Sequence, residues 1–167
     1  MIPNYNTEQL KEILKDFFIL TNIRIVIFDD KLNQILSYPE IDTKFCRTIR
    51  KDPKVDAECK QSDYEACMEC KRRNELYTYH CHIGLTETVA PLKYNEITIG
   101  YIMFGQILQS EKKEEKWKEI LENCRDYNID FEKLKEAFFE KNPFPEKNYM
   151  LPLKSWKHVP VIFIFPG

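Results

Sequence analysis

The chain has 167 residues, of which 43% are hydrophobic, 13% aromatic and 31% charged. This composition is typical of a folded protein of one domain with a sizeable core, and it excludes a disordered chain. Twenty-five basic residues are matched by 27 acidic ones, for a formal net charge of −2. No basic block stands apart, so charge does not indicate that this chain binds nucleic acid directly.

The N-terminal segment carries no signal for export. Its charged residues interrupt the apolar ones, so it lacks the continuous apolar core of a secretory signal. No run approaches the roughly 18 apolar residues that a membrane-spanning helix needs. We therefore expect a cytoplasmic protein without a membrane partner, in which the six cysteines remain thiols or serve as metal ligands.

The hydrophobic pattern of the first 74 residues predicts a helix, a strand pair and two further helices. Thr7, a residue type favoured at helix N-caps, precedes apolar residues at helical spacing up to Phe18. A β-branched strand then ends at the turn signal Asp29-Asp30, and Pro39 ends its partner strand. The predicted helices cover residues 9–18, 45–50 and 56–74, and the predicted strands cover 22–28 and 35–38.

The remainder of the chain predicts three strands and then two helices. A short polar turn at 93–96 indicates that the second and third of these strands form a hairpin. The Pro-rich residues 148–167 predict no definite element. The predicted strands cover 76–80, 87–92 and 97–108, and the predicted helices cover 110–124 and 129–139.

This order of elements predicts an α+β fold. We expect a five-stranded antiparallel sheet with helices inserted after the second strand and further helices at the N- and C-terminal ends. The arrangement is that of PAS-like sensor domains, which enclose a pocket between the sheet and the helices. The predicted sensory domain covers residues 5–126, and residues 127–167 form a C-terminal helix and a Pro-rich tail of undetermined role.

The segment from Cys59 to Leu85 holds four of the six cysteines and two of the three histidines. Such a density of soft ligands and titratable groups suits a metal site, a reactive-thiol site or the polar end of a small-molecule pocket. These three interpretations predict different chemistry for the same residues.

Helix geometry limits the metal interpretation. On one unbroken helix, Cys59 and Cys70 lie about 16 Å apart along the axis, whereas zinc–sulfur bonds are about 2.3 Å long. A single zinc ion therefore cannot bind both. Cys67 and Cys70 share a helix face, and Cys81 with His80 or His82 could join them across a turn. The candidate metal-ligating set is Cys67, Cys70, Cys81 and His82.

The reactive-thiol interpretation centres on Cys81. Its histidine neighbours, His80 and His82, are residues that can lower the pKa of a thiol. A cysteine hydrolase would also need an oxyanion hole and an orienting group, and the chain carries no signature of one. We therefore expect no enzymatic activity. Cys46 and Cys124 fit helical core positions, where a cysteine is a small apolar residue.

The pocket interpretation uses the same segment together with the last predicted strand. Ile102, Met103 and Phe104 can supply apolar walls, and polar groups can orient a ligand. The candidate polar groups are His82, Glu87, Gln106 and the thiols.

The ordered set of these segments resembles the PocR-type sensory domain. The resemblance runs from about Leu10 to Leu108. The matching segments are Phe45 to Arg50, Cys59 with Ser62-Asp63, Tyr79 to Leu85, Val89 to Leu92, Ile99-Gly100 and Phe104 to Gln106. By this resemblance, the positions characteristic of the family correspond to Cys46, Cys59, Cys81, His82, Gly84 and Leu85.

The resemblance implies a PAS-like domain that senses a short diol or a hydrocarbon derivative. Domains of this family usually precede an AraC-type DNA-binding domain or a histidine kinase. The chain departs from the family pattern at Cys67 and Cys70, which are additional cysteines. It also offers no helix-turn-helix pair in its Pro-rich C-terminal residues, so no output activity carries over.

We therefore expect a non-enzymatic sensor of transcriptional or signalling function that binds a small organic ligand, assembles as a homodimer and holds no cofactor. The expected ligand-binding residues are Cys46, Cys59, Cys81, His82, Glu87, Phe104 and Gln106. The alternative is a metal- or redox-sensing domain that uses the cluster of Cys67, Cys70, Cys81 and His82, with zinc as the expected metal.

Overall fold

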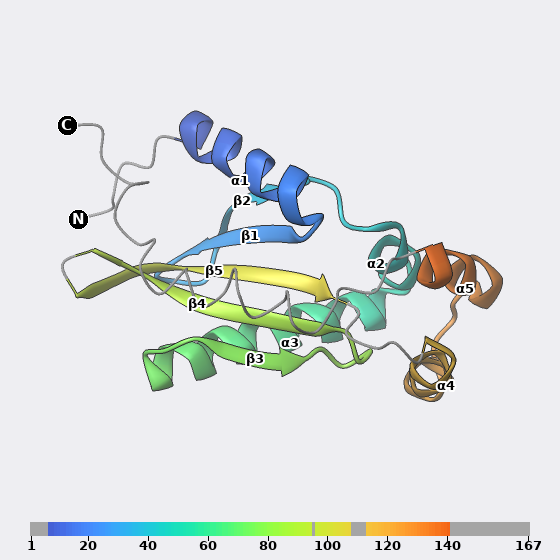
Figure 1. The fold of residues 1–167 in the computed structure, drawn as a ribbon. Helices are drawn as coiled ribbons and strands as arrows, with labels where there is room; N and C mark the ends of the chain where they lie inside the picture. The colour runs from blue at the N-terminus through green and yellow to red at the C-terminus, as the bar shows by residue number, and fades with distance from the viewer. Residues whose placement is uncertain (1–6, 95, 108–112, 141–167) are drawn as a thin grey trace.

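The computed structural model describes residues 7–94, 96–107 and 113–140. For Tyr94, Gln106 and Ile107 it describes only the backbone. Five strands form one sheet in the order β2-β1-β5-β4-β3 (Figure 1). All neighbouring strands are antiparallel, which confirms the predicted five-stranded antiparallel sheet. The strands are β1 (Arg24–Asp29), β2 (Gln34–Tyr38), β3 (Tyr77–His80), β4 (Thr86–Tyr94) and β5 (Ile97–Ile107).

Five helices accompany the sheet in the described part of the chain. Two of them lie between β2 and β3, as predicted, so the fold class is α+β and PAS-like. The predicted tail at 148–167 lies outside the described residues. The helices are α1 (Thr7–Thr21), α2 (Lys44–Ile49), α3 (Pro53–Arg73), α4 (Lys113–Cys124) and α5 (Phe131–Glu140).

Local signals explain the two inserted helices. Thr43 caps α2 by accepting a hydrogen bond from the backbone of Cys46. Asp52 caps α3, and Pro53 occupies its first turn, where a missing N–H is harmless. The helix runs unbroken for 21 residues and ends at Asn74, whose φ of 55° is left-handed. Cys59 and Cys70 therefore lie on one continuous helix.

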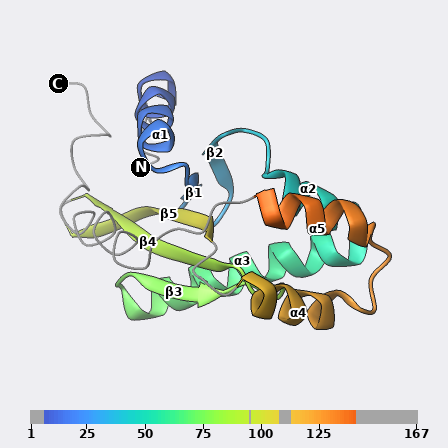
Figure 2. The same cartoon turned by 45° about the vertical axis from the view of Figure 1, so that its right-hand side comes forward.

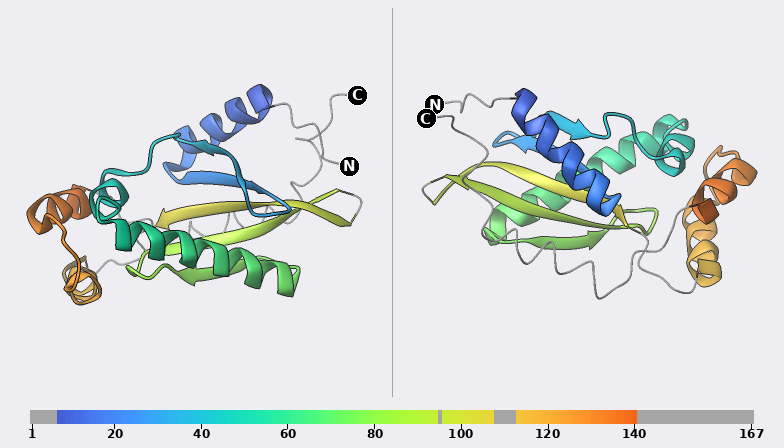
Figure 3. Two further views of the ribbon diagram at one scale, coloured as in Figure 1. Left: turned by 180° about the vertical axis from the view of Figure 1, so that it is seen from behind. Right: turned by 45° about the horizontal axis from the view of Figure 1, so that its top comes forward.

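Two helices cover opposite faces of the sheet (Figure 3). Strand side chains alternate between the faces, so Phe104 packs with α1 residues such as Leu14. Tyr101 and Met103 face the other way and pack with Cys67 and other residues of α3. The layers are thus α1, the sheet and α3.

A third core lies beyond the end of the sheet, where α2, α4 and α5 gather near the start of α3 (Figure 2). Phe45 of α2, Trp117 of α4 and Phe138 of α5 are buried in it. Their rings contact one another, with centroids 6.1 Å apart for Phe45–Phe138 and 5.4 Å apart for Trp117–Phe138. The core continues into α5, beyond the expected boundary at residue 126.

No helix in the described ranges combines the length and the apolar character needed to cross a membrane.

Candidate functional site

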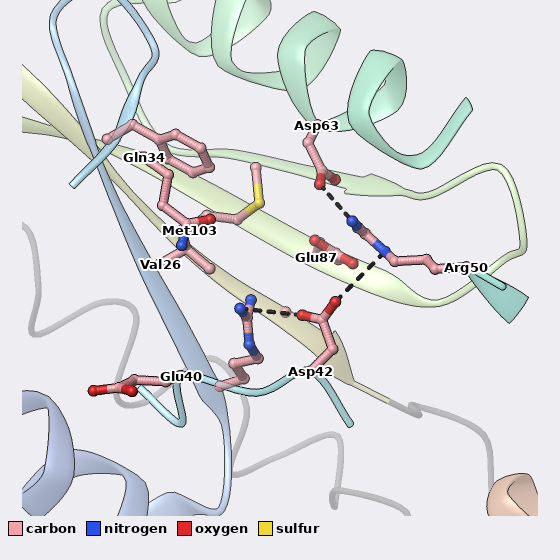
Figure 4. Close-up of a pocket in the computed structure, with 11 residues that line it drawn as sticks. Val26, Gln34, Glu40, Asp42, Arg50, Asp63, Glu87 and Met103 are labelled. Atoms are coloured by element: carbon pink, nitrogen blue, oxygen red, sulfur yellow. Dashed lines mark hydrogen bonds and ion pairs between the residues drawn. The ribbon is translucent and has the colours of Figure 1, made fainter. Parts of the chain in front are cut away.

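A polar cavity of about 250 Å³ lies between the sheet and the inserted helices (Figure 4). Its walls come from the four strands β1, β2, β4 and β5, from the end of α2, from α3, and from residues 39–43, which join β2 to α2. Most of the surface that lines it is polar, unlike that of a hydrocarbon pocket. The lining residues are Arg24, Val26, Phe28, Gln34, Glu40, Asp42, Arg50, Asp63, Glu87, Met103 and Gly105.

Four charged side chains form a row of ion pairs along one side of the cavity (Figure 4). Arg24 Nη2 lies 3.1 Å from Asp42 Oδ1, and Arg50 Nε lies 3.8 Å from Asp42 Oδ2. Arg50 Nη2 lies 3.4 Å from Asp63 Oδ2. Arg50 also reaches Asp56, with 3.5 Å between Nη1 and Oδ1. One arginine, the residue that follows α2, thus links the loop at 39–43 to α3.

The hydroxyl of Tyr79 links this row of ion pairs to a further carboxylate, that of Glu87. It lies 3.0 Å from Asp63 Oδ1 and 3.2 Å from Glu87 Oε2, so it can donate its proton to either. Burial raises the pKa of Tyr79, and the two carboxylates raise it further. Burial also raises the pKa of Asp63, while Arg50 and the Tyr79 hydroxyl act against that rise. Tyr79 is therefore a neutral donor that holds two acidic side chains together.

Gly105 provides the space that the Glu87 carboxylate occupies. A Cβ added at Gly105 would lie 2.8 Å from Glu87 Oε2 and 2.9 Å from its Cδ. Glu87 is only 8% exposed. A close approach of this kind is a typical reason for glycine within a strand.

Two guanidinium N–H groups in the cavity wall make no hydrogen bond within the described part of the chain. The Nε atoms of Arg24 and Arg50 are buried, and neither donates a hydrogen bond to any described residue. Buried donors of this kind usually donate a hydrogen bond to protein or water. A bound molecule with an acceptor atom could therefore accept hydrogen bonds from these two Nε–H groups.

Among the expected ligand-binding residues, Glu87 lines this cavity. Phe104 lies on the opposite face of β5, under α1, because side chains alternate along the strand. Gln106 belongs to β5, but its side chain lies outside the described part of the chain. The other four residues are not among the lining residues of the cavity: Cys46, Cys59, Cys81 and His82.

The three cysteines among these residues lie close to one another, and Cys46 and Cys59 are also close to Arg50. Cys46 and Cys59 are buried in the core of α2, α4 and α5, and Cys81 packs against it. The proximity of Arg50 acts to lower the pKa of Cys59, but burial outweighs it. Burial raises the pKa of Cys59, and it raises that of Cys81 to about 11. The arrangement therefore favours protonated core thiols over nucleophilic thiolates.

The structure does not bring the expected metal-ligating residues together. Cys67 and Cys70 pack between α3 and the sheet, whereas Cys81 and His82 belong to the turn before β4. Burial raises the pKa of Cys67 and of Cys70 to about 12, and Cys70 Sγ donates to the carbonyl of Glu75. Within residues 7–94, 96–107 and 113–140, no group of three or more His, Cys, Asp or Glu side chains is placed to hold a metal ion.

His82 sits in a separate polar cluster between α3 and the loop that joins α4 to α5. Its Nε2 lies 4.0 Å from Glu58 Oε2, and its ring meets the ring of Tyr127 edge-on at 6.4 Å. Tyr127 donates its hydroxyl proton to Glu58. Both ring nitrogens of His82 are buried without a hydrogen-bond partner among the described residues. Burial lowers the pKa of His82, Arg50 adds to the effect, and Glu58 opposes it.

We expect this histidine to make the protein less stable in mild acid. In the unfolded chain it binds a proton near pH 6.5, whereas in the folded protein it does so only at lower pH. The unfolded state therefore binds more protons as the pH falls below 6.5, and the free energy of unfolding drops by up to about 1.4 kcal/mol per pH unit. Urea unfolding across this range should show a shallower pH dependence for His82→Gln. An equal slope in both proteins would contradict the expectation.

Most of the charged residues that line the cavity were not predicted from the sequence. Arg24, Val26 and Phe28 all line the cavity because they share one face of β1. An arginine on the same face as two apolar residues of a central strand was the available signal. Asp42 and Arg50 lie in a loop and at a helix end, where a charged residue is ordinary, so local pattern could not identify them.

Comparisons with known proteins identify the family of this chain. The family model described as the sensory domain found in PocR matches residues 5–151. The Regulatory protein PocR of Salmonella typhimurium (strain LT2) is 27% identical over 105 residues. The aligned segment covers 61% of this chain and 33% of that relative, so the chain spans about a third of its length. No solved structure matches. Because the family model covers far more than half of the chain, the protein belongs to the PocR sensory-domain family.

Proposed function

We propose that this domain binds a small organic ligand in the polar cavity and serves as the sensing part of a transcriptional or signalling regulator. The single observation that supports this proposal most is the cavity itself, which lies between the sheet and the inserted helices and is lined by charged groups that are mostly partly buried. The description of the family as a sensory domain and the printed name of the relative, a regulatory protein, point the same way.

The size and polarity of the cavity favour a short, hydroxylated compound. A water molecule takes up roughly 30 Å³ in the liquid, so about 250 Å³ suits a compound of a few heavy atoms, such as a short diol. Carboxylates can accept from its hydroxyl protons, and guanidinium groups can donate to its oxygens. We propose binding without turnover.

The loop at residues 39–43 can carry the ligand signal to the outer helices. Asp42 faces the cavity, while its neighbour Glu40 pairs with Lys11 of α1. Immediately after the loop, Lys44 lies 3.2 Å from Glu136 and 2.9 Å from Glu140, both in α5. A ligand that displaces Asp42 would therefore bias α1 and α5 together, provided that it binds the two arrangements with different affinity.

A homodimer formed through α1 would respond to a ligand that changes the position of α1. The helix exposes Ile19 and Leu20 near its end, and Ile41 is exposed as well. We propose this apolar surface as the dimer contact.

A thermal-shift panel tests the ligand-binding proposal. A binder at a hundred times its Kd stabilises the folded state by about 2.7 kcal/mol, so short diols, aldehydes and amines can be compared by the rise in Tm. We expect Gly105→Ala to abolish the rise, because the new Cβ would displace the Glu87 carboxylate. Ile97→Ala, at an exposed position of the same strand, is the control and should keep the full shift.

Two outcomes would count against the proposal. One is a panel in which no compound raises the Tm of the wild-type protein. The other is a Gly105→Ala variant that folds and responds as the wild type does.

A further inference from the structure

A larger groove of about 620 Å³ adjoins the polar cavity. It lies between the β1–β2 hairpin and α3, which the left panel of Figure 3 shows from the side of α3. Four residues line both the cavity and the groove: Phe28, Gln34, Arg50 and Asp63. Figure 4 shows Gln34 on one side of the cavity and Arg50 with Asp63 on the other. The cavity therefore meets the groove between these side chains.

Apolar side chains from both elements line the groove beyond this point. Phe28 of β1 and Leu32 of the following turn are half-buried and pack against the cluster that contains Cys67 of α3. The Cys67 thiol is uncharged at neutral pH, because burial raises its pKa to about 12. Ala57 and Tyr64 are exposed and lie two turns apart on one face of α3. The small side chain of Ala57 leaves this part of the groove open.

The turn between β1 and β2 holds Leu32 in the wall of the groove. The φ of Leu32 is 68°, in the left-handed region that a leucine adopts only at a cost. The Asp29 side chain accepts hydrogen bonds from the backbone N–H groups of Lys31 and Asn33, at 2.9 and 2.8 Å, and so fixes the turn. An apolar side chain thus occupies a position where asparagine or glycine would be less strained.

The cavity and the groove favour different parts of a ligand. In the cavity, the Nε–H groups of Arg24 and Arg50 make no hydrogen bond within the described part of the chain. Hydroxyl oxygens can accept from them, and hydroxyl protons can be donated to the carboxylates nearby. In the groove, an alkyl chain would cover Phe28, Leu32 and Ala57, and removing apolar surface from water favours binding.

We propose that the cavity and the groove form one binding site for a hydroxylated compound with an apolar arm of several carbons. The hydroxyl groups lie in the cavity, and the arm lies against Phe28, Leu32 and Ala57. This inference rests on the proposed sensing function, and it makes Leu32 a residue that determines specificity for the length of the arm.

Four compounds with one head group and arms of increasing length test the inference: 1,2-propanediol, 1,2-butanediol, 1,2-pentanediol and 1,2-hexanediol. Each added methylene that becomes half to fully buried should raise the affinity about two- to fourfold. Isothermal titration of the wild-type protein should therefore give an affinity for 1,2-hexanediol at least about eightfold above that for 1,2-propanediol, because three methylenes are added.

Leu32→Asn should remove most of this gain. Asparagine adopts the left-handed conformation more readily than leucine, so the turn should keep its shape, whereas an amide gains nothing from contact with an alkyl chain. Leu32 is not among the residues that line the cavity, so the variant should bind 1,2-propanediol as the wild type does. Its affinity for 1,2-hexanediol should fall at least about fourfold.

Met68→Gln is the matched control. Met68 is an exposed apolar residue of α3 that is not among the residues lining the groove. This variant should keep the full dependence on arm length, which separates binding in the groove from adsorption to exposed apolar surface. Urea unfolding establishes that both variants are folded, and the comparison of the four diols on the wild type does not depend on them.

The outcomes separate the two proposals. If 1,2-propanediol binds the wild type and longer arms bring no gain, the groove inference is wrong and the sensing function stands. If none of the four diols binds, the inference is overturned as well, and the wider thermal-shift panel decides the sensing function on its own. A dependence on arm length that survives Leu32→Asn, or that Met68→Gln removes equally, would place the arm outside the groove.

Discussion

Arg50→Ala should lower the free energy of unfolding by about 3 kcal/mol, the lower end of the cost of breaking a buried ion pair. The substitution leaves Asp42 and Asp63 without the cation they share. The lower end applies because the Arg50 side chain is 23% exposed. Urea unfolding at neutral pH measures the loss.

The loss should also depend on pH. Without Arg50, the pKa of Asp63 should rise further above its usual value, because burial then acts with less opposition. A carboxyl group with a raised pKa in the folded state favours folding below its unfolded pKa, and this contribution disappears as the pH rises through the folded pKa. The destabilisation caused by Arg50→Ala should therefore be smaller near pH 4 than at neutral pH.

Arg125→Ala provides the matched control for this substitution. Arg125 pairs with Glu122 and Asp126, but its side chain is 71% exposed. Exposed ion pairs contribute little, so this variant should unfold as the wild type does. Similar losses for the two variants would mean that the row of ion pairs in the cavity wall does not stabilise the fold.

Phe138→Ala should cost about 3 to 5 kcal/mol, the range for removing a buried phenylalanine from a core. The side chain is fully buried and contacts the rings of Phe45, Trp117 and Phe139. These contacts join α5 to α2 and α4. Chemical unfolding should also remain one cooperative transition, because the residue belongs to a core shared by several elements.

Lys135→Ala, on the exposed side of the same helix, is the control for Phe138→Ala. It leaves the core intact and should change the free energy of unfolding by less than about 0.5 kcal/mol. If Phe138→Ala were equally mild, α5 would be an appendage, as the expected boundary at residue 126 implies. A second, separate unfolding transition for α5 would have the same meaning.

Arg50 belongs to the cavity wall and Phe138 to the core formed by α2, α4 and α5. These two parts of the structure meet at α2. One end of this short helix carries Lys44, which pairs with α5, and Arg50 follows its other end and reaches into the cavity. Its buried face, with Phe45 and Ile49, belongs to the core formed with α4 and α5. The cavity wall and the C-terminal core therefore depend on the position of one helix, which is why a ligand there can influence both.

Hydrophobic periodicity by itself determined the order of the elements. It is a local property: alternation of side chains every two residues or at helical spacing is visible within one segment. The strand pair around Asp29, the long helix ending near Asn74 and the hairpin that includes Met103 were all predictable in this way. The ordered cysteine, histidine and glycine positions led to the family, which the match over residues 5–151 confirms.

Only the tertiary structure decided where the candidate site lies. Alternation along β5 separates Phe104 from Met103, but it does not say which face meets α3 and which meets α1. The cysteine-rich segment likewise divides, because α3 is unbroken and carries Cys59 toward one core and Cys70 toward another. The charged wall comes from five separate segments, with Arg24, Asp42, Arg50, Asp63 and Glu87 meeting only after folding. Long-range ion pairs of this kind leave no local pattern, so the sequence determined the architecture and the fold determined the site.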